Sequence, residues 1–325
     1  MKELLIDENN EKQTLIKYLR RLFPNSADSF FYKMLRKKNI VLNGKKATGK
    51  ESLTAGDSVQ IFFSDETFEK LSSAGTDDVK DAFQSLLQAS FPEPEVIYEC
   101  PDFLAVNKAP GILSQKAEGR DISINEMLLS YAAQKGLITA DSYVRFHPSV
   151  SNRLDRNTSG LLFFALTLKG QQFLTEMLRD RTLKKYYLTL VHGRPAETAD
   201  TKAFLRKDEK TNTVTVRDRD FDGAREIHTG IEVLSSSEEF SLLKVYLITG
   251  APHQIRAHLK FLGCPIVFDP KYGDTVKDRK ISFKNRRQML HSYETVFPDG
   301  KEFMAPVPSD MRALCRECGA GISGI

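Results

Sequence analysis

The spacing of apolar residues predicts a small mixed domain at the start of the chain. Apolar positions recur three or four apart through two segments, which is the period of an α-helix. Two shorter apolar runs have strand length, and the first ends at Asn43-Gly44, a pair typical of tight turns. The expected elements are helices over 14–23 and 30–38 and strands over 40–45 and 58–63.

The pattern changes after residue 95 and predicts a larger domain of the α+β class. Runs between residues 213 and 247 alternate apolar and polar positions and are joined by polar turns, which favours an antiparallel meander. We therefore expect a mixed, mainly antiparallel sheet flanked by helices. The expected strands are 96–100, 103–108, 161–166, 184–193, 213–216, 226–234, 240–247 and one near 266, and the expected helices are 124–131, 168–180 and one that closes at Gly263.

The stretch between these two domains is acidic and predicts a linker. Residues 65–95 contain eight Asp and Glu but two Lys, and residues 72–76 are flexible by composition. A short helix is expected over 81–87. The expected domains are therefore 1–64, 65–95 and 96–325, and the acidity of the linker should keep it away from any polyanion that its neighbours attract.

Composition excludes several classes of protein. The 325 residues are 41% hydrophobic and 28% charged, as in globular proteins of about two domains. No segment approaches the ~20 apolar residues of a membrane span, and the charged start of the chain is unlike a secretory signal. Four scattered Cys residues suit a reducing compartment better than a disulfide scaffold. We therefore expect a cytoplasmic protein with no membrane partner.

The positive charge is concentrated near the N-terminus. The whole chain has a net charge of +4, but residues 12–64 contain eleven Lys and Arg against three acidic residues. Such asymmetry favours a module that binds a polyanion, although a solvated charged face is the alternative. The candidate contacts, from the basic end of the second helix and the turn after it, are Arg36, Lys37, Lys38 and Lys45.

The most informative chemistry lies just before the strand at 161–166. The run 152–160 is dense in polar residues, places Asp155 between Arg153 and Arg156, and ends in Gly160, which permits close backbone approach. Flanking guanidinium groups favour the charged form of a carboxylate. A charged carboxylate in a partly dry site can act as a nucleophile or a base, whereas an ordinary ion pair is the alternative.

Arg153-Leu154-Asp155-Arg156, followed by Thr158-Ser159-Gly160, resembles the catalytic motif of the RluA-type pseudouridine synthases. Two further segments resemble that family's motifs, in the right order: 185–193 and 249–273. Asn107-Lys108-Ala109-Pro110-Gly111 resembles its opening turn, and residues 12–64 resemble the alpha-L RNA-binding module. The resemblance implies conversion of uridine to pseudouridine in RNA, a reaction without redox or energy input, so we expect no cofactor.

The resemblance also implies roles for individual residues. Asp155 would attack the anomeric carbon of the sugar or stabilise its cationic or glycal form, and Arg256 would pair with it. Tyr187 would stack on uracil and serve in removing the ring proton. Strand alternation puts Tyr186 on the opposite face, so we expect it to be structural. The expected substrate-binding residues are Arg153, which would take the place of the displaced base, Lys108, Lys185, His253 and Gln254.

Three positions depart from the family pattern: Asn152 replaces His, Asn157 replaces an acidic residue, and Ala251 replaces Arg. None of them removes the expected catalytic residues. No metal is expected, because His253 and His258 lack a third ligand in register and Cys315-x-x-Cys318 has no second pair. We expect a monomer acting on large-subunit ribosomal RNA. A tRNA enzyme and a non-catalytic ribosome assembly factor are the alternatives.

Overall fold

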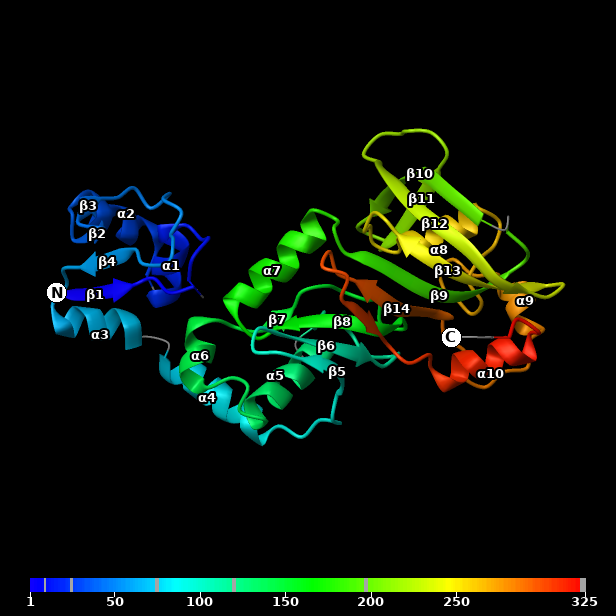
Figure 1. Cartoon of the computed structure of the whole chain (residues 1–325), viewed down its shortest axis with the longest axis horizontal. Coiled ribbons are helices and arrows are strands. Elements are labelled where there is room, and N and C mark those ends of the chain that lie inside the picture. The colour runs from blue at the N-terminus through cyan, green and yellow to red at the C-terminus, as the bar shows by residue number, and fades with distance from the viewer. Residues whose placement is uncertain (9, 24–25, 74–75, 119–120, 196–197, 322–325) are drawn as a thin grey trace.

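Two separate sheets organise the chain (Figure 1). The computed structural model describes residues 1–321 except 9, 24–25, 74–75, 119–120 and 196–197. The smaller sheet lies at the N-terminal end and has the strand order β1-β4-β2-β3. The elements of this region are β1 (Lys2–Leu5), α1 (Leu15–Leu22), α2 (Asp28–Arg36), β2 (Ile40–Leu42), β3 (Lys45–Lys46) and β4 (Ser58–Ile61).

This N-terminal module, residues 1–63, has a hydrophobic core of its own. Leu15 and Leu19 of α1, and Phe31 and Leu35 of α2, are buried against the sheet. Their spacing of four residues places each pair on one helix face. The two predicted helices and the strand near 58–63 are confirmed. Strand β1 is not expected from the sequence, because four residues are too few for a period; its pairing with β4 fixes it.

The larger sheet carries the rest of the fold. Its strands pair antiparallel except for β8 and β14, which run parallel. The α+β prediction is confirmed. In spatial order the main path is β11 (Thr213–Arg217), β10 (Thr198–Asp208), β12 (Arg225–Ser236), β13 (Phe240–Leu247), β9 (Lys184–His192), β14 (Leu290–Val296), β8 (Ser159–Ala165), β6 (Phe103–Lys108) and β5 (Glu95–Glu99), with β15 (Glu302–Met304) beside β14 and β7 (Ser149–Val150) beside β8.

Helices cover both faces of this sheet. Leu104 and Val106 of β6 pack into one core with residues of α5 (Ile124–Gln134), whereas Phe103 and Ala105 face a second core with residues of α7 (Leu168–Arg179). This alternation explains why β6 and β8 read as continuous apolar runs. The helices are α3 (Asp65–Ser73), α4 (Thr76–Gln88), α5 (Ile124–Gln134), α6 (Ala140–Arg145), α7 (Leu168–Arg179), α8 (Gln254–Phe261), α9 (Thr275–Arg279) and α10 (Ser309–Glu317).

The meander differs from the sequence prediction in two places. Strand β10 is one of the longest in the sheet but is not predicted, because its Lys, Arg, Asp and Thr residues hide the alternation. It pairs with both β11 and β12, and its alternating residues Ala203 and Leu205 are buried in a small core. The strand expected near 266 is reduced to a single bridge between Val191 and Ile266.

The acidic stretch 65–95 is mostly helical. The expected short helix is part of α4, which contacts both α5 and α6. Phe83 of α4 is buried in the core beneath β6 and β8. The second half of the stretch therefore packs as part of the larger domain instead of forming a tether.

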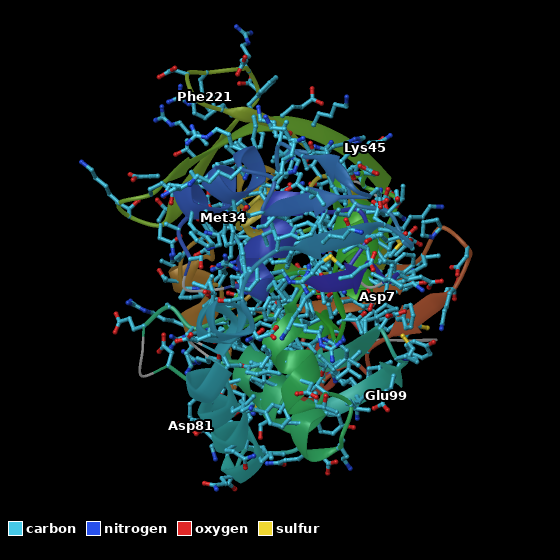
Figure 2. The ribbon with its side chains drawn as sticks, turned by 90° about the vertical axis from the view of Figure 1, so that its left-hand side faces the viewer. Asp7, Met34, Lys45, Asp81, Glu99 and Phe221 are labelled. Carbon is cyan, nitrogen blue, oxygen red and sulfur yellow. The ribbon has the colours of Figure 1, made fainter. Side chains whose placement is uncertain are left out.

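A small polar interface joins the N-terminal module to the larger domain. The Arg21 Nε donates to the carbonyl oxygen of Arg145 at 2.7 Å, capping the last turn of α6. Gln172 of α7 donates to the carbonyl oxygen of Glu11 at 2.9 Å. Figure 2 views the molecule from the module's side, with Met34 and Lys45 toward the viewer and Phe221 of the β11–β12 loop projecting beyond. Among the described residues, no helix is long and apolar enough to cross a membrane.

Candidate active site

The loop that joins β7 to β8 carries Asp155. It ends at Gly160, whose φ is +109°. A Cβ atom at that position would lie 2.1 Å from the backbone carbonyl oxygen of Ser292. Only glycine permits this contact, which brings β8 beside β14 in a parallel pair. The predicted close backbone approach at Gly160 is confirmed.

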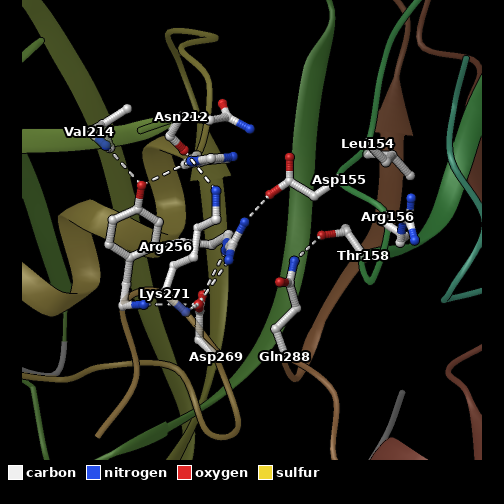
Figure 3. A network of polar contacts seen from close by, with 12 residues as sticks. Leu154, Asp155, Arg156, Thr158, Asn212, Val214, Arg256, Asp269, Lys271 and Gln288 are labelled. Atoms are coloured by element: carbon white, nitrogen blue, oxygen red, sulfur yellow. Dashed lines mark hydrogen bonds and ion pairs between the residues drawn. The ribbon is translucent and has the colours of Figure 1, made fainter. Parts of the chain in front are cut away.

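Long-range hydrogen bonds hold this catalytic loop, residues 151–160. The Gln288 side-chain amide donates to Thr158 Oγ1 at 2.7 Å (Figure 3). The Ser114 hydroxyl accepts from the Leu154 N–H at 2.9 Å and donates to the Leu154 carbonyl oxygen at 2.8 Å. The Ser159 hydroxyl lies 3.0 Å from His291 Nδ1. The backbone on both sides of Asp155 is therefore fixed by groups from distant segments.

Arg256 joins Asp155 to a second carboxylate. Its Nη1 donates to Asp155 Oδ2 at 2.6 Å, and its Nε and Nη2 donate to the two oxygens of Asp269 at 2.6 and 2.8 Å (Figure 3). The exposed fractions of the side chains are 32% for Asp155, 5% for Arg256 and 0% for Asp269. The buried pair thus positions one accessible carboxylate.

The electrostatics of this triad follow from its geometry. Burial alone would raise the pKa of Asp269, but the bidentate Arg256 guanidinium and two backbone N–H groups hold it below its usual value. Burial opposes the charge of Arg256, yet Asp269 and Asp155 raise the pKa of its guanidinium above the usual value. Asp269 therefore offsets the cost of burying Arg256, and the Nη1 group of Arg256 remains to donate to Asp155.

Tyr187 of β9 lines the same cavity. Burial raises the pKa of its phenol to about 12, Asp155 adds to that shift, and a hydrogen bond with Ser292 opposes it. The resting phenol is neutral, and ionising it at pH 7 would cost about 7 kcal/mol. The next residue back, Tyr186, points to the opposite face and stacks on Tyr246 with 5.1 Å between ring centroids. The two tyrosines therefore lie as strand alternation predicts.

The cavity around Asp155 is large and strongly basic. Its volume is about 970 Å³, and it is lined by seven Lys and Arg side chains. Asp155 is the one carboxylate among the described residues that line it. Such a surface would attract a polyanion and hold a single negative group at its centre. The basic residues are Arg153, Arg156, Arg181, Lys185, Lys207, Arg256 and Lys271.

The other predicted site residues divide into two groups. Arg153 is exposed, Lys185 and His253 are half-buried, and all three line the cavity. Burial lowers the pKa of Lys185, and Arg181 adds to that shift. Gln254 also borders the cavity, but its amide is fully used within the protein: its oxygen accepts from Thr249 and Ala251, and its nitrogen donates to His228 and Thr229.

Lys108 does not line the cavity and lies beneath the catalytic loop. Its Nζ donates to the carbonyl oxygens of Ala109, Ile112 and Arg156 at 2.9, 2.9 and 3.1 Å. Burial lowers the pKa of Lys108 to about 7, while Asp155 acts in the opposite direction. Three carbonyl acceptors need all three protons of the ammonium group, so the charged form is the one that holds the loop. The expected substrate contact is thus replaced by a positioning contact.

Replacing Lys108 by Met should destabilise the fold by about 2–4 kcal/mol, because three carbonyl oxygens would lose their shared donor. The free energy of unfolding from urea titration measures this. The control is Lys116→Met, at an exposed lysine a few residues along the chain, which should stay within about 0.5 kcal/mol of the wild type. Equal stabilities for the two variants would contradict a structural role for Lys108.

The sequence alone assigns no site role to three residues that shape the site. Asp269, Gln288 and Ser114 lie far from Asp155 along the chain, and each acts through a hydrogen bond that only the fold creates. Asp269 belongs to the segment Asp269-Pro270-Lys271-Tyr272-Gly273, at the end of the motif that begins at residue 249. This position in the motif is the sequence feature that could have identified Asp269 as a site residue. His253, expected to bind substrate, precedes α8 in a left-handed conformation.

Comparisons with known proteins decide the family. A family profile described as RNA pseudouridylate synthase matches residues 102–261. The ribosomal large subunit pseudouridine synthase C of Vibrio parahaemolyticus is 30% identical to this chain over 95% of the chain and 94% of its own length.

The chain belongs to the RluA-type pseudouridine synthases. An uncharacterized RNA pseudouridine synthase of Mycoplasma genitalium, MG370, is 29% identical over 91% of this chain and 89% of its own length. Among solved structures, human RNA Pseudouridylate Synthase Domain Containing 4 shares the fold, with a TM-score of 0.58 and 18% identity over 76% of this chain and 99% of that one. This pseudouridine synthase has no group of three or more His, Cys, Asp or Glu suited to a metal within its described residues.

Proposed function

We propose that this pseudouridine synthase acts on large-subunit ribosomal RNA and uses Asp155 as its essential catalytic residue. The observation that carries the catalytic assignment is the placement of one accessible carboxylate in a cavity lined by seven cations. A flipped uridine brings its phosphates with it. The Lys and Arg side chains that line the cavity would bind those phosphates, and Asp155 would contact the sugar.

The proposed reaction needs no atoms beyond those of the substrate. The bond from C1′ to N1 of uracil breaks, and the electron pair leaves with the base. Asp155 attacks C1′ or stabilises the positive charge that develops there. The base turns, C5 bonds to C1′, the proton on C5 is lost, and N1 gains a proton. Arg256 keeps the Asp155 carboxylate aimed throughout.

Tyr187 and Arg153 complete this proposal. Tyr187, buried and neutral, would contact the uracil ring. To accept the proton from C5 of the base, the neutral hydroxyl would have to give its own proton to a partner such as Ser292. Arg153 is exposed at the rim of the cavity. Its guanidinium would occupy the position that the flipped base leaves in its RNA helix.

Two features support ribosomal RNA as the target. Several relatives that cover most of the chain are named for the large ribosomal subunit. The N-terminal module also exposes its basic residues Arg36, Lys37, Lys38 and Lys45. A compact basic surface of this kind suits the phosphates of a large structured RNA.

Carbodiimide mapping of pseudouridine tests the target. Unmodified large-subunit ribosomal RNA and an unmodified tRNA pool are each incubated with the wild type and with Asp155→Asn. Stops that arise in ribosomal RNA with the wild type alone support the proposal and identify the uridines. Stops confined to tRNA would show that the substrate is tRNA. Binding of RNA without modification in either pool would favour a non-catalytic assembly factor.

Neutralising the module should weaken RNA binding and reduce its salt dependence. We expect the quadruple variant with Gln at positions 36, 37, 38 and 45 to lower the slope of log affinity against log salt by about 3.6, because each phosphate contact on a duplex contributes about 0.9. The turnover number at saturating RNA should stay within twofold. Filter binding across salt concentrations measures the slope.

The control for this variant replaces Lys135 and Lys202, two exposed lysines of the larger domain, by Gln. Their loss should leave the slope nearly unchanged. A quadruple variant whose slope matches this control would show that the module does not contact RNA phosphates.

A further inference from the structure

The residue before α8, His253, adopts a conformation that few side chains favour. Its φ is +53°, in the left-handed region. Such a backbone is strained for a residue other than glycine and persists where surrounding contacts hold it, often at functional sites. His253 lines the cavity that holds Asp155. A buried tyrosine then fixes the ring.

The hydroxyl of Tyr272 stands between His253 and strand β11. It accepts a hydrogen bond from the Val214 N–H at 2.9 Å and lies 2.9 Å from His253 Nδ1 (Figure 3). The whole residue Tyr272 is 5% exposed. Because the Val214 amide supplies one proton, the hydroxyl has its own proton left to donate. Among the described residues, His253 Nδ1 is the one acceptor that lies within hydrogen-bond distance of this hydroxyl.

The hydrogen bond between Tyr272 and His253 determines the tautomer of the His253 imidazole. If Nδ1 carried a proton, the buried tyrosine hydroxyl would have no acceptor, which costs free energy. If Nδ1 accepts, every group is satisfied and the imidazole proton sits on Nε2. The structure gives Nε2 no hydrogen-bond partner among the described residues, so this N–H group remains free for a ligand in the cavity.

We infer that Tyr272 holds His253 as a neutral imidazole whose Nε2–H donates a hydrogen bond to an oxygen acceptor of the target nucleotide. The inference rests on the proposed function for its ligand, whereas the tautomer stands independently of it. His253 is a substrate-contacting residue, and Tyr272 is a positioning residue that acts through it. In either case the acceptor is an oxygen atom, which belongs to a uracil carbonyl or to a backbone phosphate.

The charged groups around the imidazole support a neutral ring. Burial lowers the pKa of His253, Arg256 and Lys271 lower it further, and Asp155 and Asp269 act in the opposite direction. A cationic imidazole beside Asp155 would compete with Arg256 for the carboxylate and weaken it as a nucleophile. Removing the hydroxyl of Tyr272 frees Nδ1 to take a proton, so the pKa of His253 should rise toward its usual value of about 6.5.

The first test is the pH dependence of kcat/KM on ribosomal RNA between pH 5.5 and 7.5. Each profile is divided by that of His253→Gln, which keeps an N–H donor but cannot titrate. The wild type should then be flat within twofold. Tyr272→Phe should lose about tenfold at pH 5.5, whereas the matched control Tyr186→Phe, at the tyrosine on the opposite sheet face, should follow the wild type. A flat profile for Tyr272→Phe would overturn the inference.

The second test reads the tautomer without any reaction. Long-range ¹H–¹⁵N spectra of the free enzyme distinguish Nε2–H from Nδ1–H imidazoles, and His253→Gln assigns the signal. A protonated Nε2 at pH 7 supports the inference, and a protonated Nδ1 overturns it. If the wild type modifies no RNA but shows the Nε2–H form, the proposed function fails and the tautomer assignment survives.

The third test identifies the acceptor once the target uridine is mapped. His253→Ala should lower kcat/KM by about tenfold to hundredfold on a short RNA that contains the target. The same RNA is then prepared with a methylphosphonate in place of the adjacent phosphate. If His253→Ala no longer lowers kcat/KM on the methylphosphonate RNA, the acceptor is the phosphate. If the variant still lowers kcat/KM on that RNA, the acceptor is the base. Full activity of His253→Ala on unmodified RNA would rule out the contact.

Discussion

Replacing Asp155 by Asn is expected to lower pseudouridine formation by at least about 10⁴-fold, the range seen when a nucleophile is removed. The amide oxygen of Asn can still accept the hydrogen bond from Arg256, so the shape of the site should be kept. What the variant loses is the negative charge and the nucleophilic oxygen. Single-turnover measurement with excess enzyme separates this loss of chemistry from any change in product release.

RNA affinity supplies the control for Asp155→Asn. The seven cations that line the cavity remain in place, so the dissociation constant should rise by no more than about threefold and could fall, because a negative charge has been removed from an anion site. A matched variant, Asp141→Asn, changes an exposed carboxylate in the first turn of α6 and should retain full activity. Turnover by Asp155→Asn within tenfold of the wild type would exclude Asp155 as the essential residue.

Replacing Arg256 by Gln is expected to damage both stability and activity. Asp269 is fully buried and would lose its bidentate partner, which should destabilise the fold by about 3–5 kcal/mol. Asp155 would lose the contact that aims it, and a misplaced nucleophile costs at least about 10²-fold in rate. Urea titration and single-turnover kinetics on the same preparation measure the two effects.

A second substitution separates these two effects. In the Arg256→Gln background, Asp269→Asn removes the uncompensated buried charge but keeps an oxygen that can accept from the N–H groups of Lys271 and Tyr272. We expect the double variant to regain most of the lost stability and none of the lost activity. Recovery of activity along with stability would mean that Arg256 serves only the fold.

The parts of this fold that were predictable share a physical cause. Strands β6 and β8 are buried on both faces, so their sequences are apolar throughout and stand out from the rest. The Gly160 contact was predictable because glycine lacks the Cβ atom that would keep a neighbouring backbone away from the start of such a strand. The opposite faces of Tyr186 and Tyr187 follow from the two-residue period of a strand alone.

What escaped prediction depends on partners far along the chain. Lys108 looks like a surface lysine at the end of a strand until the catalytic loop folds over it and supplies carbonyl oxygens. Strand β10 buries Ala203 and Leu205, but polar residues outnumber them, and backbone pairing on both sides completes the strand. The imidazole of His253 is held by Tyr272, nineteen residues away. Local patterns record burial and period, but they do not record which distant group completes a hydrogen bond.

The parallel contact between β8 and β14 joins two regions of the larger sheet through two residue pairs, Ser159 with His291 and Gly160 with Ser292. Asp155 lies on one side of this contact, and Arg256 and Tyr187 lie on the other. One core lies wholly on the β8 side, around α5, whereas a second core spans the contact, with Phe163 of β8 packed against Phe297 and Phe303. A molecule in which either side has opened therefore has no catalytic pair, however intact the other remains. We therefore expect enzymatic activity to report the cooperative folding of the whole larger domain, so that a partly folded chain is inactive.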